Sequence, residues 1–469
     1  MGWGMLSAQK TGLLTQFLGT LPEHLASRLA KAVEVDRLSD GATLPHDVIL
    51  QGLRPVLRRG DTRDRTPTPL RLFCRPFEDL LTSAPRREKQ KARIARASVT
   101  PMWLWVSGTL LPQAAQAYTE ESKLLLVSSK PEEARDRAVA FWNEVSVAVR
   151  NALSTDAGRK QARVAMNGDL GVADALEIAL LLSVGGEILD LQDNLPKPVP
   201  AFTDDLIRMA RGTYDRFVAT VPDAAPYVAV IVMNRLYRPW EALRLPLLVS
   251  RKQQDTLISS TDMGLVGELL FGDLDKLSQA IRSTHHVQFD AEEMVGNVAS
   301  FAELSSAIVK EIAVRRDGKW GQSLLKDRAE VGNVMDTFME RASKEIAGAL
   351  PMHKSGSFAG VRVPDFSRPV DPERIERALR YAKLVAGCKP FASAASFAVS
   401  LKDAQDEAID YLRRYNDDLV KELRSSDSSR RQIVQEYLAL ATELTAILFS
   451  EQEADLLRRR GRAALAAAA

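Results

Sequence analysis

The spacing of apolar side chains constrains the fold of this chain more than any other feature, because they recur every three or four residues over long stretches. This spacing is sustained in residues 131–154, and Pro131 stands where the first turn of a helix tolerates a proline. Thr203 precedes two aspartates, as an N-cap residue does. Few stretches alternate apolar and polar residues as half-buried strands do. The sequence predicts an all-α fold, an irregular multi-helix bundle or array with little or no sheet.

A second long stretch, residues 291–314, predicts a helix with one buried face. Asp290 precedes it and is expected to cap its first turn. Ser305 occupies one position on the otherwise apolar face. The predicted buried face consists of Met294, Val298, Phe301, Ile308 and Ile312.

The domain organisation follows from length and from one break in the helical pattern. The chain has 469 residues, whereas a domain usually holds about 100–200. Residues 351–372 are rich in proline, glycine and serine and have no helical period, which predicts a linker or a long loop. We expect two to three helical units. The predicted parts are a basic N-terminal helical region (1–99), a central helical domain (100–350), the linker (351–372) and a C-terminal helical unit (373–469).

The C-terminal part of the chain carries the most regular apolar stripe. Its members alternate by four and three residues, and Val434, Ala441 and Leu448 widen it. A coiled coil needs about three to four such heptads, so packing within a bundle is favoured, and a seam between copies is the alternative. The predicted interaction seam consists of Ile433, Tyr437, Leu440, Leu444 and Ile447.

A basic region covers residues 54–96, which hold 13 Lys or Arg side chains against 5 Asp or Glu. Six of the cations fall within residues 86–96, and a helix there would place them on two exposed faces. Such a surface could bind phosphates by charge, but a solvated face or a dock for the acidic middle of the chain is favoured. The candidate anion- or partner-binding residues are Arg86, Arg87, Lys89, Lys91, Arg93 and Arg96.

A tryptophan-rich run follows the basic segment at residues 102–111. Thr100 and Pro101 are typical of the cap and the first turn of a new helix. This helix would be apolar on all sides, which predicts that Trp103 and Leu104 are buried. Binding of single-stranded nucleic acid requires exposed aromatic rings for base stacking and is therefore not favoured.

The longest apolar stretch, residues 224–249, does not predict a membrane span. Arg235, Arg238 and Arg244 interrupt it, and a span needs about 20 consecutive apolar residues. The N-terminus lacks the pattern of a signal peptide. The chain holds two cysteines, too few for a disulfide framework, which predicts buried thiols in a reducing compartment. We expect a cytoplasmic protein without a transmembrane segment.

Candidate metal and catalytic residues are sparse. His285 and His286 stand near carboxylates, but adjacent histidines point apart on a helix, so no metal site is predicted. Asp190 and Asp193 lie one helical turn apart, and residues 416–422 form a second acidic turn. Two such turns hold Mg²⁺ against a diphosphate in all-α isoprenoid synthases, but the adjacent aspartates and the spaced Ser and Glu of those motifs are missing here. We predict no catalytic residue and no cofactor.

These observations favour a non-catalytic function. We expect a helical scaffold or adaptor that binds other proteins and can associate with itself. The first alternative is a nucleic-acid-associated protein that uses the basic region 54–96, and the second is a Mg²⁺-dependent all-α enzyme that acts on a diphosphate. The alanine-rich end of the chain resembles the degradation tags of bacterial proteins, but its leucine lies four residues from the end, so a frayed terminus is favoured. We expect a bacterial protein.

Overall fold

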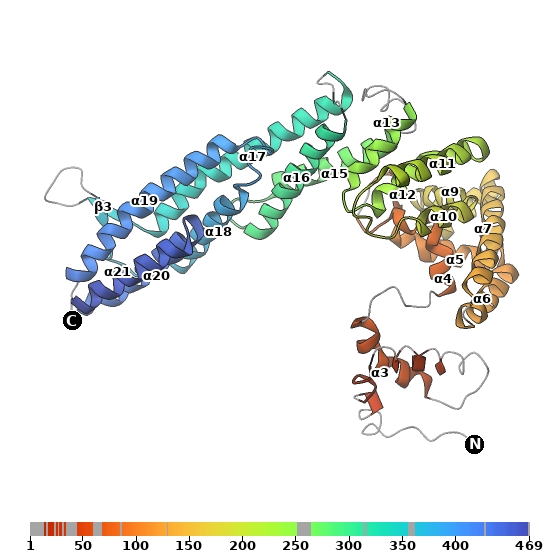
Figure 1. The fold of residues 1–469 in the computed structure, drawn as a ribbon, viewed down its shortest axis with the longest axis horizontal. Coiled ribbons are helices and arrows are strands. Elements are labelled where there is room, and N and C mark those ends of the chain that lie inside the picture. Colours follow the sequence, from red (N-terminus) through yellow and green to blue (C-terminus); the bar gives the residue numbers. More distant parts are fainter. Residues whose placement is uncertain are drawn as a thin grey trace. The chain divides into compact units, whose positions relative to one another are not determined.

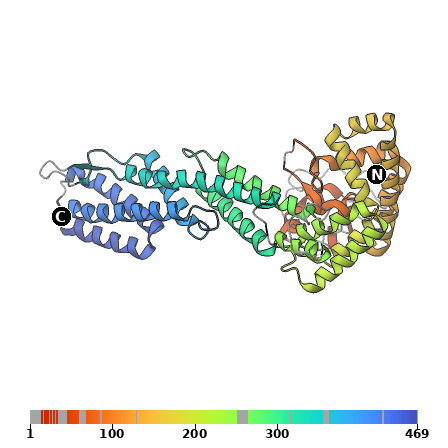
Figure 2. The ribbon, with the colours of Figure 1, turned by 90° about the horizontal axis from the view of Figure 1, so that it is seen from above.

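The structure is a computed structural model in which the chain forms two compact units, unit 1 (residues 1–237) and unit 2 (residues 238–469) (Figures 1 and 2). The all-α prediction is confirmed, because the strands of the described residues form two short pairs only. The structure describes residues 14–15, 17–22, 25–26, 28–30, 32–33, 45–59, 68–84, 87–128, 130–250, 264–312, 314, 317–354, 362–425 and 428–467.

Unit 1 is built from many short helices. Its elements are α3 (His46–Arg59), α4 (Pro69–Cys74), η2 (Arg75–Leu80), β1 (Leu81–Thr82), β2 (Ile94–Ala95), η3 (Arg96–Ser98), α5 (Val99–Trp105), η4 (Val106–Leu110), α6 (Pro112–Val127), α7 (Pro131–Ser154), α8 (Asp156–Ala165), α9 (Asp169–Leu182), α10 (Gly185–Asp193), α11 (Asp204–Thr220), η5 (Pro222–Ala224) and α12 (Ala225–Arg235). The predicted N-cap of α11 is confirmed, since the Thr203 hydroxyl accepts a hydrogen bond from the Leu206 N–H.

The core of unit 1 forms where α7 packs against α6 and α9. Aromatic rings from α4, α6 and α7 meet there, and the rings of Tyr118 and Phe141 stack with centroids 4.4 Å apart. Gly185 lets α10 approach α7, because a Cβ atom at this position would lie 2.5 Å from the Trp142 ring. A separate small apolar cluster in the N-terminal part joins α3 to the residues before it through Leu18, Ala26, Val33, Ile49, Leu53 and Val56.

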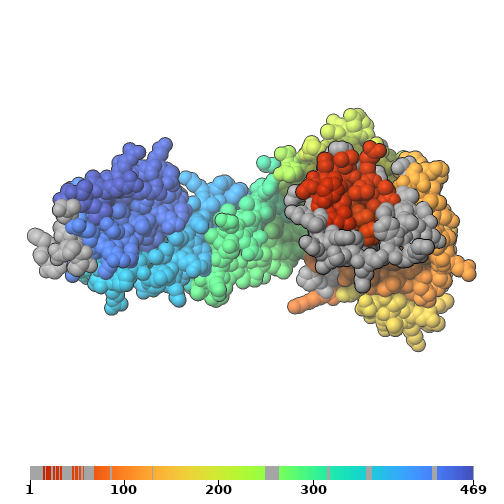
Figure 3. All heavy atoms as spheres, turned by 90° about the horizontal axis from the view of Figure 1, so that it is seen from below, coloured from red at the N-terminus to blue at the C-terminus, as the bar shows by residue number. Residues whose placement is uncertain are grey.

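Unit 2 is dominated by long helices that run side by side (Figure 2). Its elements are η6 (Pro239–Leu243), α13 (Arg244–Ser250), α15 (Leu265–Ser283), α16 (Ala291–Glu311), α17 (Lys319–Ala349), β3 (Met352–Lys354), β4 (Arg362–Pro364), α18 (Pro372–Cys388), α19 (Ala398–Ser425), α20 (Ser428–Leu448) and α21 (Glu451–Ala467). Helix α17 packs on α15, α18 and α19, and α20 packs on α18, α19 and α21. Figure 3 shows the outer surface of the C-terminal residues of unit 2, in dark blue.

The helical periods seen in the sequence bury the expected faces of unit 2. The predicted face of α16 is buried, including the polar Ser305. Asp290 caps this helix by accepting a hydrogen bond of 2.8 Å from the Glu293 N–H. Apolar spacing therefore located both the helix and the side that faces the core.

The predicted linker lies inside unit 2. Strands β3 and β4 pair in antiparallel fashion, and β4 contacts α19. The helices on either side of this segment, α17 and α18, pack directly against each other. The division between the units falls instead between Tyr237 and Arg238, inside the region 100–350 that was expected to be one central domain. The break in helical period marked a strand pair within unit 2 here, because a strand interrupts the helical pattern as a linker does.

Among the described residues, no helix has both the length and the apolar character that crossing a membrane requires. This agrees with the interruption of the stretch 224–249 by arginines. In the structure that stretch is divided among α12, η6 and α13.

Candidate functional site

The basic segment that follows residue 86 is not a helix. Ile94 and Ala95 form β2, which pairs in parallel with β1, and the residues before β2 form turns. The expected helix with two cationic faces is therefore wrong for residues 87–95, and Arg96 begins the three-residue η3. Arg86 lies outside the described residues. Long-range contacts explain this difference, because side chains of α9 bind the segment along its length.

Helix α9 is almost wholly apolar, yet it carries two buried carboxylates. Asp174 is completely buried and Glu177 is nearly so. The Lys89 ammonium donates to Asp174 Oδ1 at 2.9 Å and also contacts Glu177 Oε2. Buried charges must be paired to be tolerated, and this triad satisfies that requirement.

The same carboxylates bind the backbone of the basic segment. Glu177 accepts a hydrogen bond of 2.7 Å from the Ala92 N–H, and Asp174 accepts one of 3.2 Å from the Ala95 N–H. Ala92 is buried with a φ of 62°, a conformation that costs energy for a residue with a Cβ atom. The hydrogen bond from Glu177 helps to hold it there. These contacts fix the course of the segment across α9.

Two hydroxyl groups complete this buried cluster. Ser98 donates to Asp174 Oδ2 at 2.6 Å, and Tyr227 of α12 donates to Glu177 Oε1 at 2.5 Å. Burial raises the pKa of the Tyr227 phenol, and the neighbouring Glu177 carboxylate raises it further. The phenol therefore stays protonated and acts as a hydrogen-bond donor, so the cluster ties α9, α12 and the basic segment together.

The cations of the segment divide into two groups. Lys89 has only 20% of its side chain exposed, and Arg93 is half-buried, so the expectation that both are exposed is wrong. Arg87, Lys91 and Arg96 are exposed. The predicted alternative of a dock on the acidic middle of the chain therefore describes Lys89, whose partners both lie on α9.

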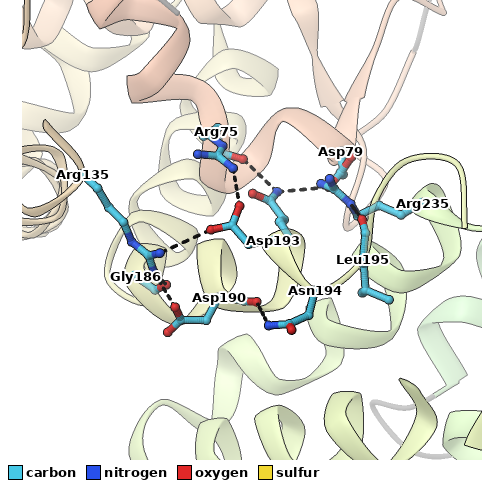
Figure 4. Close-up of polar contacts among 10 residues, drawn as sticks. Arg75, Asp79, Arg135, Gly186, Asp190, Asp193, Asn194, Leu195 and Arg235 are labelled. Atoms are coloured by element: carbon cyan, nitrogen blue, oxygen red, sulfur yellow. Dashed lines mark hydrogen bonds and ion pairs between the residues drawn. The ribbon is translucent and has the colours of Figure 1, made fainter. Parts of the chain in front are cut away.

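A second ion-pair network surrounds the end of α10 (Figure 4). Asp193 binds Arg75 at 2.6 Å and Arg135 at 3.3 Å, and Asp190 binds Arg135 at 2.5 Å. The acidic turn considered for Mg²⁺ is thus neutralised by arginines from η2 and α7. Its carboxylates serve to join helices.

A completely buried carboxylate side chain, that of Asp79, organises the other half of Figure 4. Arg235 Nη1 lies 2.9 Å from Asp79 Oδ2, and Lys197 Nζ lies 3.1 Å from Asp79 Oδ1. Gln192 Nε2 donates to Asp79 at 3.1 Å and to the Arg75 carbonyl at 3.0 Å. These bonds connect η2 to α10 and α12.

The remaining metal candidates do not assemble into a centre. The rings of His285 and His286 stack with centroids 4.7 Å apart. In the second acidic turn, Asp417 binds Arg460 at 2.7 Å and Asp418 binds Lys421 at 2.8 Å. Within the described ranges, no three His, Cys, Asp or Glu side chains are grouped to hold a metal ion.

The apolar run after the basic segment is only partly buried. Met102 and Trp105 are buried and Trp103 is half-buried, but Leu104 is 62% exposed. The predicted burial of Leu104 is wrong because α5 is seven residues long and faces the core on one side only. Apolar residues on all sides of a short helix do not ensure that every side is covered.

The predicted C-terminal seam is covered by the same chain. Tyr437, Leu440 and Leu444 are buried, and Ile433 and Ile447 are half-buried. Helices α18, α19 and α21 pack around α20, which agrees with the bundle interpretation of this stripe. The helix ends at Leu448, and α21 begins at Glu451 as a separate element.

A groove of about 620 Å³ lies in unit 1 and is called the unit 1 groove. Arg71, Arg96 and Lys197 supply three cations to its lining, and Glu78 supplies a carboxyl group. Burial is the main cause that raises the pKa of Glu78, and the neighbouring Asp79 adds to it. Cys74 also lines this groove, where burial raises the pKa of its thiol to about 12, so it is not a reactive thiolate.

A second groove, of about 820 Å³, lies in unit 2 between η6, α16 and the turn 389–396, and is called the unit 2 groove. Trp240 and Phe391 contribute aromatic rings, and small side chains of α16 form part of its wall. Charges of both signs surround it. Among them Arg244 and Glu311 form a bidentate pair at 2.7 and 2.9 Å.

Comparisons with protein families, with curated proteins and with solved structures found no match. The geometry therefore carries the functional argument. Sequence reasoning missed Asp79 and the pair Asp174 and Glu177. A signal for the pair was present, because two acidic residues three apart inside the apolar helix 169–182 must find partners when buried.

Proposed function

We propose that this protein is a non-catalytic helical adaptor, and that the unit 2 groove binds a helical segment of a partner protein. The observation that carries this proposal is the combination of aromatic rings, small wall residues and mixed charges in one open groove. Amphipathic helices bind other proteins by laying an apolar face into a groove of this kind.

The wall of the groove suits the close approach of a helix. Ala299, Ala302 and Ser306 follow one another along one face of α16 at helical spacing, and Ala394 lies in the adjoining turn. Short side chains leave room for the side chains of a bound helix. Trp240 and Phe391 are half-buried, so each has ring surface that a partner could cover.

The charged rim favours a partner segment that carries both signs of charge. Glu303 and Lys310 are exposed on α16, and Arg238 is exposed at the start of η6. Rim charges of this kind guide association and select partners more than they add affinity. The Arg244–Glu311 pair fixes the junction between α13 and α16 and gives the rim a rigid base.

A photo-crosslinker placed at Ser306 tests this proposal in cells. We expect it to capture a defined partner, whereas the same group at the exposed position Glu443 of α20 should not, because Glu443 lies outside the groove. The captured protein is then purified and titrated against the full chain. Identical capture at Ser306 and Glu443 would contradict binding in the groove.

A charge reversal sharpens this test with the purified partner. The double variant Glu303→Lys, Lys310→Glu keeps the net charge and alters only exposed side chains. We expect it to weaken binding by about tenfold or more, mainly through slower association. The control Glu292→Lys, also exposed on α16 but outside the groove, should leave affinity unchanged. Equal affinity of the double variant and the control would reject the proposed site.

We also propose that the protein functions in the cytoplasm and can associate with itself. Cys74 and Cys388 are free cysteines, which is typical of a reducing compartment. A second copy could supply the segment that enters the unit 2 groove. Measuring the mass in solution of the wild type and of the Glu303→Lys, Lys310→Glu variant tests this, since a groove-mediated dimer would dissociate in the variant alone.

A further inference from the structure

The unit 1 groove contains two cations, Arg71 and Arg96, that differ from four cations of the same unit. Arg75, Lys89, Arg135 and Arg235 all bind carboxylates of the same unit. The guanidinium groups of Arg71 and Arg96 form no ion pair within the part of the chain that the structure describes, and both side chains are exposed. A groove that keeps two arginines available is suited to an anion.

We propose that the unit 1 groove binds the phosphate group of a small phosphorylated molecule that also carries a hydroxyl or amino group. Arg71, Arg96 and Lys197 would surround the phosphate oxygens, with guanidinium groups suited to bidentate contacts. The hydroxyl groups of Thr68 and Thr100 also line the groove and can donate further hydrogen bonds. This site is independent of the protein-binding groove proposed for unit 2.

The size of the groove indicates a ligand larger than phosphate itself. Its volume of about 620 Å³ lies within the range of small-molecule sites, roughly 300–1,000 Å³. Leu70, Leu81 and Val99 provide an apolar wall for the body of the ligand. Lys197 is held toward Asp79 at 3.1 Å but keeps about half of its side chain exposed, so it can also reach an anion.

Glu78 distinguishes a small ligand from a nucleic-acid backbone. Its carboxyl group lines the groove and forms no ion pair with the described residues, although the charges of Arg235, Arg75 and Arg71 oppose the rise of its pKa. A carboxylate beside the cations repels additional phosphates, which disfavours a chain of phosphates along the groove. It can accept a hydrogen bond from a hydroxyl or amino group instead, which favours a ligand with one phosphate and a donor group.

Calorimetric titration of the full chain with inorganic phosphate and with adenosine monophosphate tests the site. We expect both to bind, the nucleotide more tightly because it also fills the apolar part of the groove. Arg71→Ala and Arg96→Ala should each weaken binding by about tenfold, since each removes a charge-assisted contact. The matched control Lys160→Ala changes an exposed cation of α8 outside the groove and should bind as the wild type does.

Arg71 and Arg96 are exposed, so we expect both alanine variants to be as stable as the wild type. The melting temperature of each variant checks this. If Arg71→Ala is less stable, Arg71→Gln keeps the length of the side chain without its charge. Glu78→Gln removes a negative charge from the groove and should strengthen binding of inorganic phosphate. Weaker phosphate binding by Glu78→Gln would place the anion elsewhere and overturn the proposal.

Two further outcomes would also overturn it. One is that the wild type binds neither probe, or that both arginine variants bind the probes as tightly as the wild type does. The other is binding of a single-stranded oligonucleotide that neither phosphate nor adenosine monophosphate displaces. That result would assign the basic region 54–96 to nucleic acid, with an affinity that falls steeply as salt rises.

Discussion

Units 1 and 2 keep their helices together in different ways. In unit 1, the buried carboxylates Asp79, Asp174 and Glu177 bind cations and backbone groups that lie far away in the sequence. In unit 2, long helices meet through apolar faces, such as the one that buries Leu440 and Leu444 on α20. Polar contacts therefore fix the irregular segments of unit 1, whereas apolar contacts align the regular helices of unit 2.

This difference has a physical cause. A segment such as 87–98 contains few large apolar side chains, so it cannot be held by burial alone. Its backbone N–H groups need acceptors, and the carboxylates of α9 provide them. A long amphipathic helix satisfies its own backbone and needs only an apolar surface to pack against.

Substitution of Asp174 should have the largest effect. Asp174→Ala removes an acceptor of Lys89, Ser98 and the Ala95 N–H. It leaves the partly buried Lys89 cation with Glu177 and the Arg93 carbonyl as its acceptors. We expect a loss of about 3–5 kcal/mol in the free energy of unfolding, measured by urea denaturation. The control Asp169→Ala, at the exposed start of α9, breaks only a surface pair with Arg163 and should cost less than about 1 kcal/mol.

Equal effects of these two variants would break the comparison. They would show that the buried carboxylate of α9 stabilises unit 1 no more than a surface ion pair does. A loss of unfolding free energy in Asp174→Ala without a loss of secondary structure around α9 would support the comparison. It would localise the effect to the segment 87–98.

The apolar core of unit 2 should respond almost as strongly. Leu444 is completely buried on α20, and Leu444→Ala should cost about 2–5 kcal/mol of unfolding free energy through lost burial and a cavity. Leu456→Ala is the control, since Leu456 on α21 is 52% exposed and its truncation should cost about 0.5 kcal/mol or less. A change in mass of Leu444→Ala before any loss of stability would indicate that α20 joins two copies.

The contrast also explains which features could be predicted from sequence. The α20 stripe, the α16 face and the cap at Asp290 follow from residues close together along the chain, and the structure confirms them. The course of the segment 87–96 depends on Asp174 and Glu177, which lie about 80 residues later. Charge alone predicted exposure of Lys89, because the sequence does not reveal a buried partner so distant.

Neither the unit 1 groove nor the unit 2 groove could be predicted from the sequence. Arg96 belongs to the predicted basic segment, but Arg71 and Lys197 join it only through the folding of α4 and the residues after α10. The unit 2 groove combines η6 with α16 and the turn 389–396, which are distant in the chain. Neither set of residues has a spacing that indicates a shared site.

Unit 2 contains two buried carboxylates among its described residues, and they differ in their surroundings. Glu241 lies 3.7 Å from the guanidinium groups of Arg238 and Arg244, whereas Asp327 has no such ion pair there. Asp327 of α17 is 3% exposed, and its Oδ2 atom has no hydrogen-bond partner among the described residues. Burial, together with the nearby Asp275 and Glu330, raises the pKa of Asp327 from 3.8 to about 6, while Lys326 and Arg282 oppose the shift. The folded state therefore holds the proton of Asp327 to a higher pH than the unfolded chain does.

The sign of the pH dependence follows from this shift. Below pH ~4 the group is protonated in both states, and the stabilisation is fully present. It is lost as the pH rises through about 6, because ionisation is easier in the unfolded chain. Asp327→Asn should remove this decline and raise the unfolding free energy at pH 7 by about 2 kcal/mol, measured by denaturation at several pH values. The control Asp273→Asn, whose side chain is 39% exposed and pairs with Lys276, should leave the decline in place.

If the unfolding free energy of Asp327→Asn falls with rising pH as much as that of the wild type, another group causes the fall. Unit 2 would then tolerate an ionised carboxylate at Asp327 in addition to the buried Glu241, and the comparison would weaken. Loss of stability in Asp327→Asn at pH 7 would have the same consequence, since it would reveal a favourable ionic contact of Asp327.

The smallest effect is expected at Leu104, where the sequence prediction failed. Leu104 is 62% exposed on α5, so Leu104→Ser should change the unfolding free energy by about 0.5 kcal/mol or less. Its neighbour Trp105 is buried, and Trp105→Ala should cost about 3–5 kcal/mol. Thermal denaturation of the two variants compares adjacent residues of one short helix. A large loss for Leu104→Ser would mean that another surface covers this side of α5, and that apolar burial supports unit 1 more widely than its ion pairs indicate.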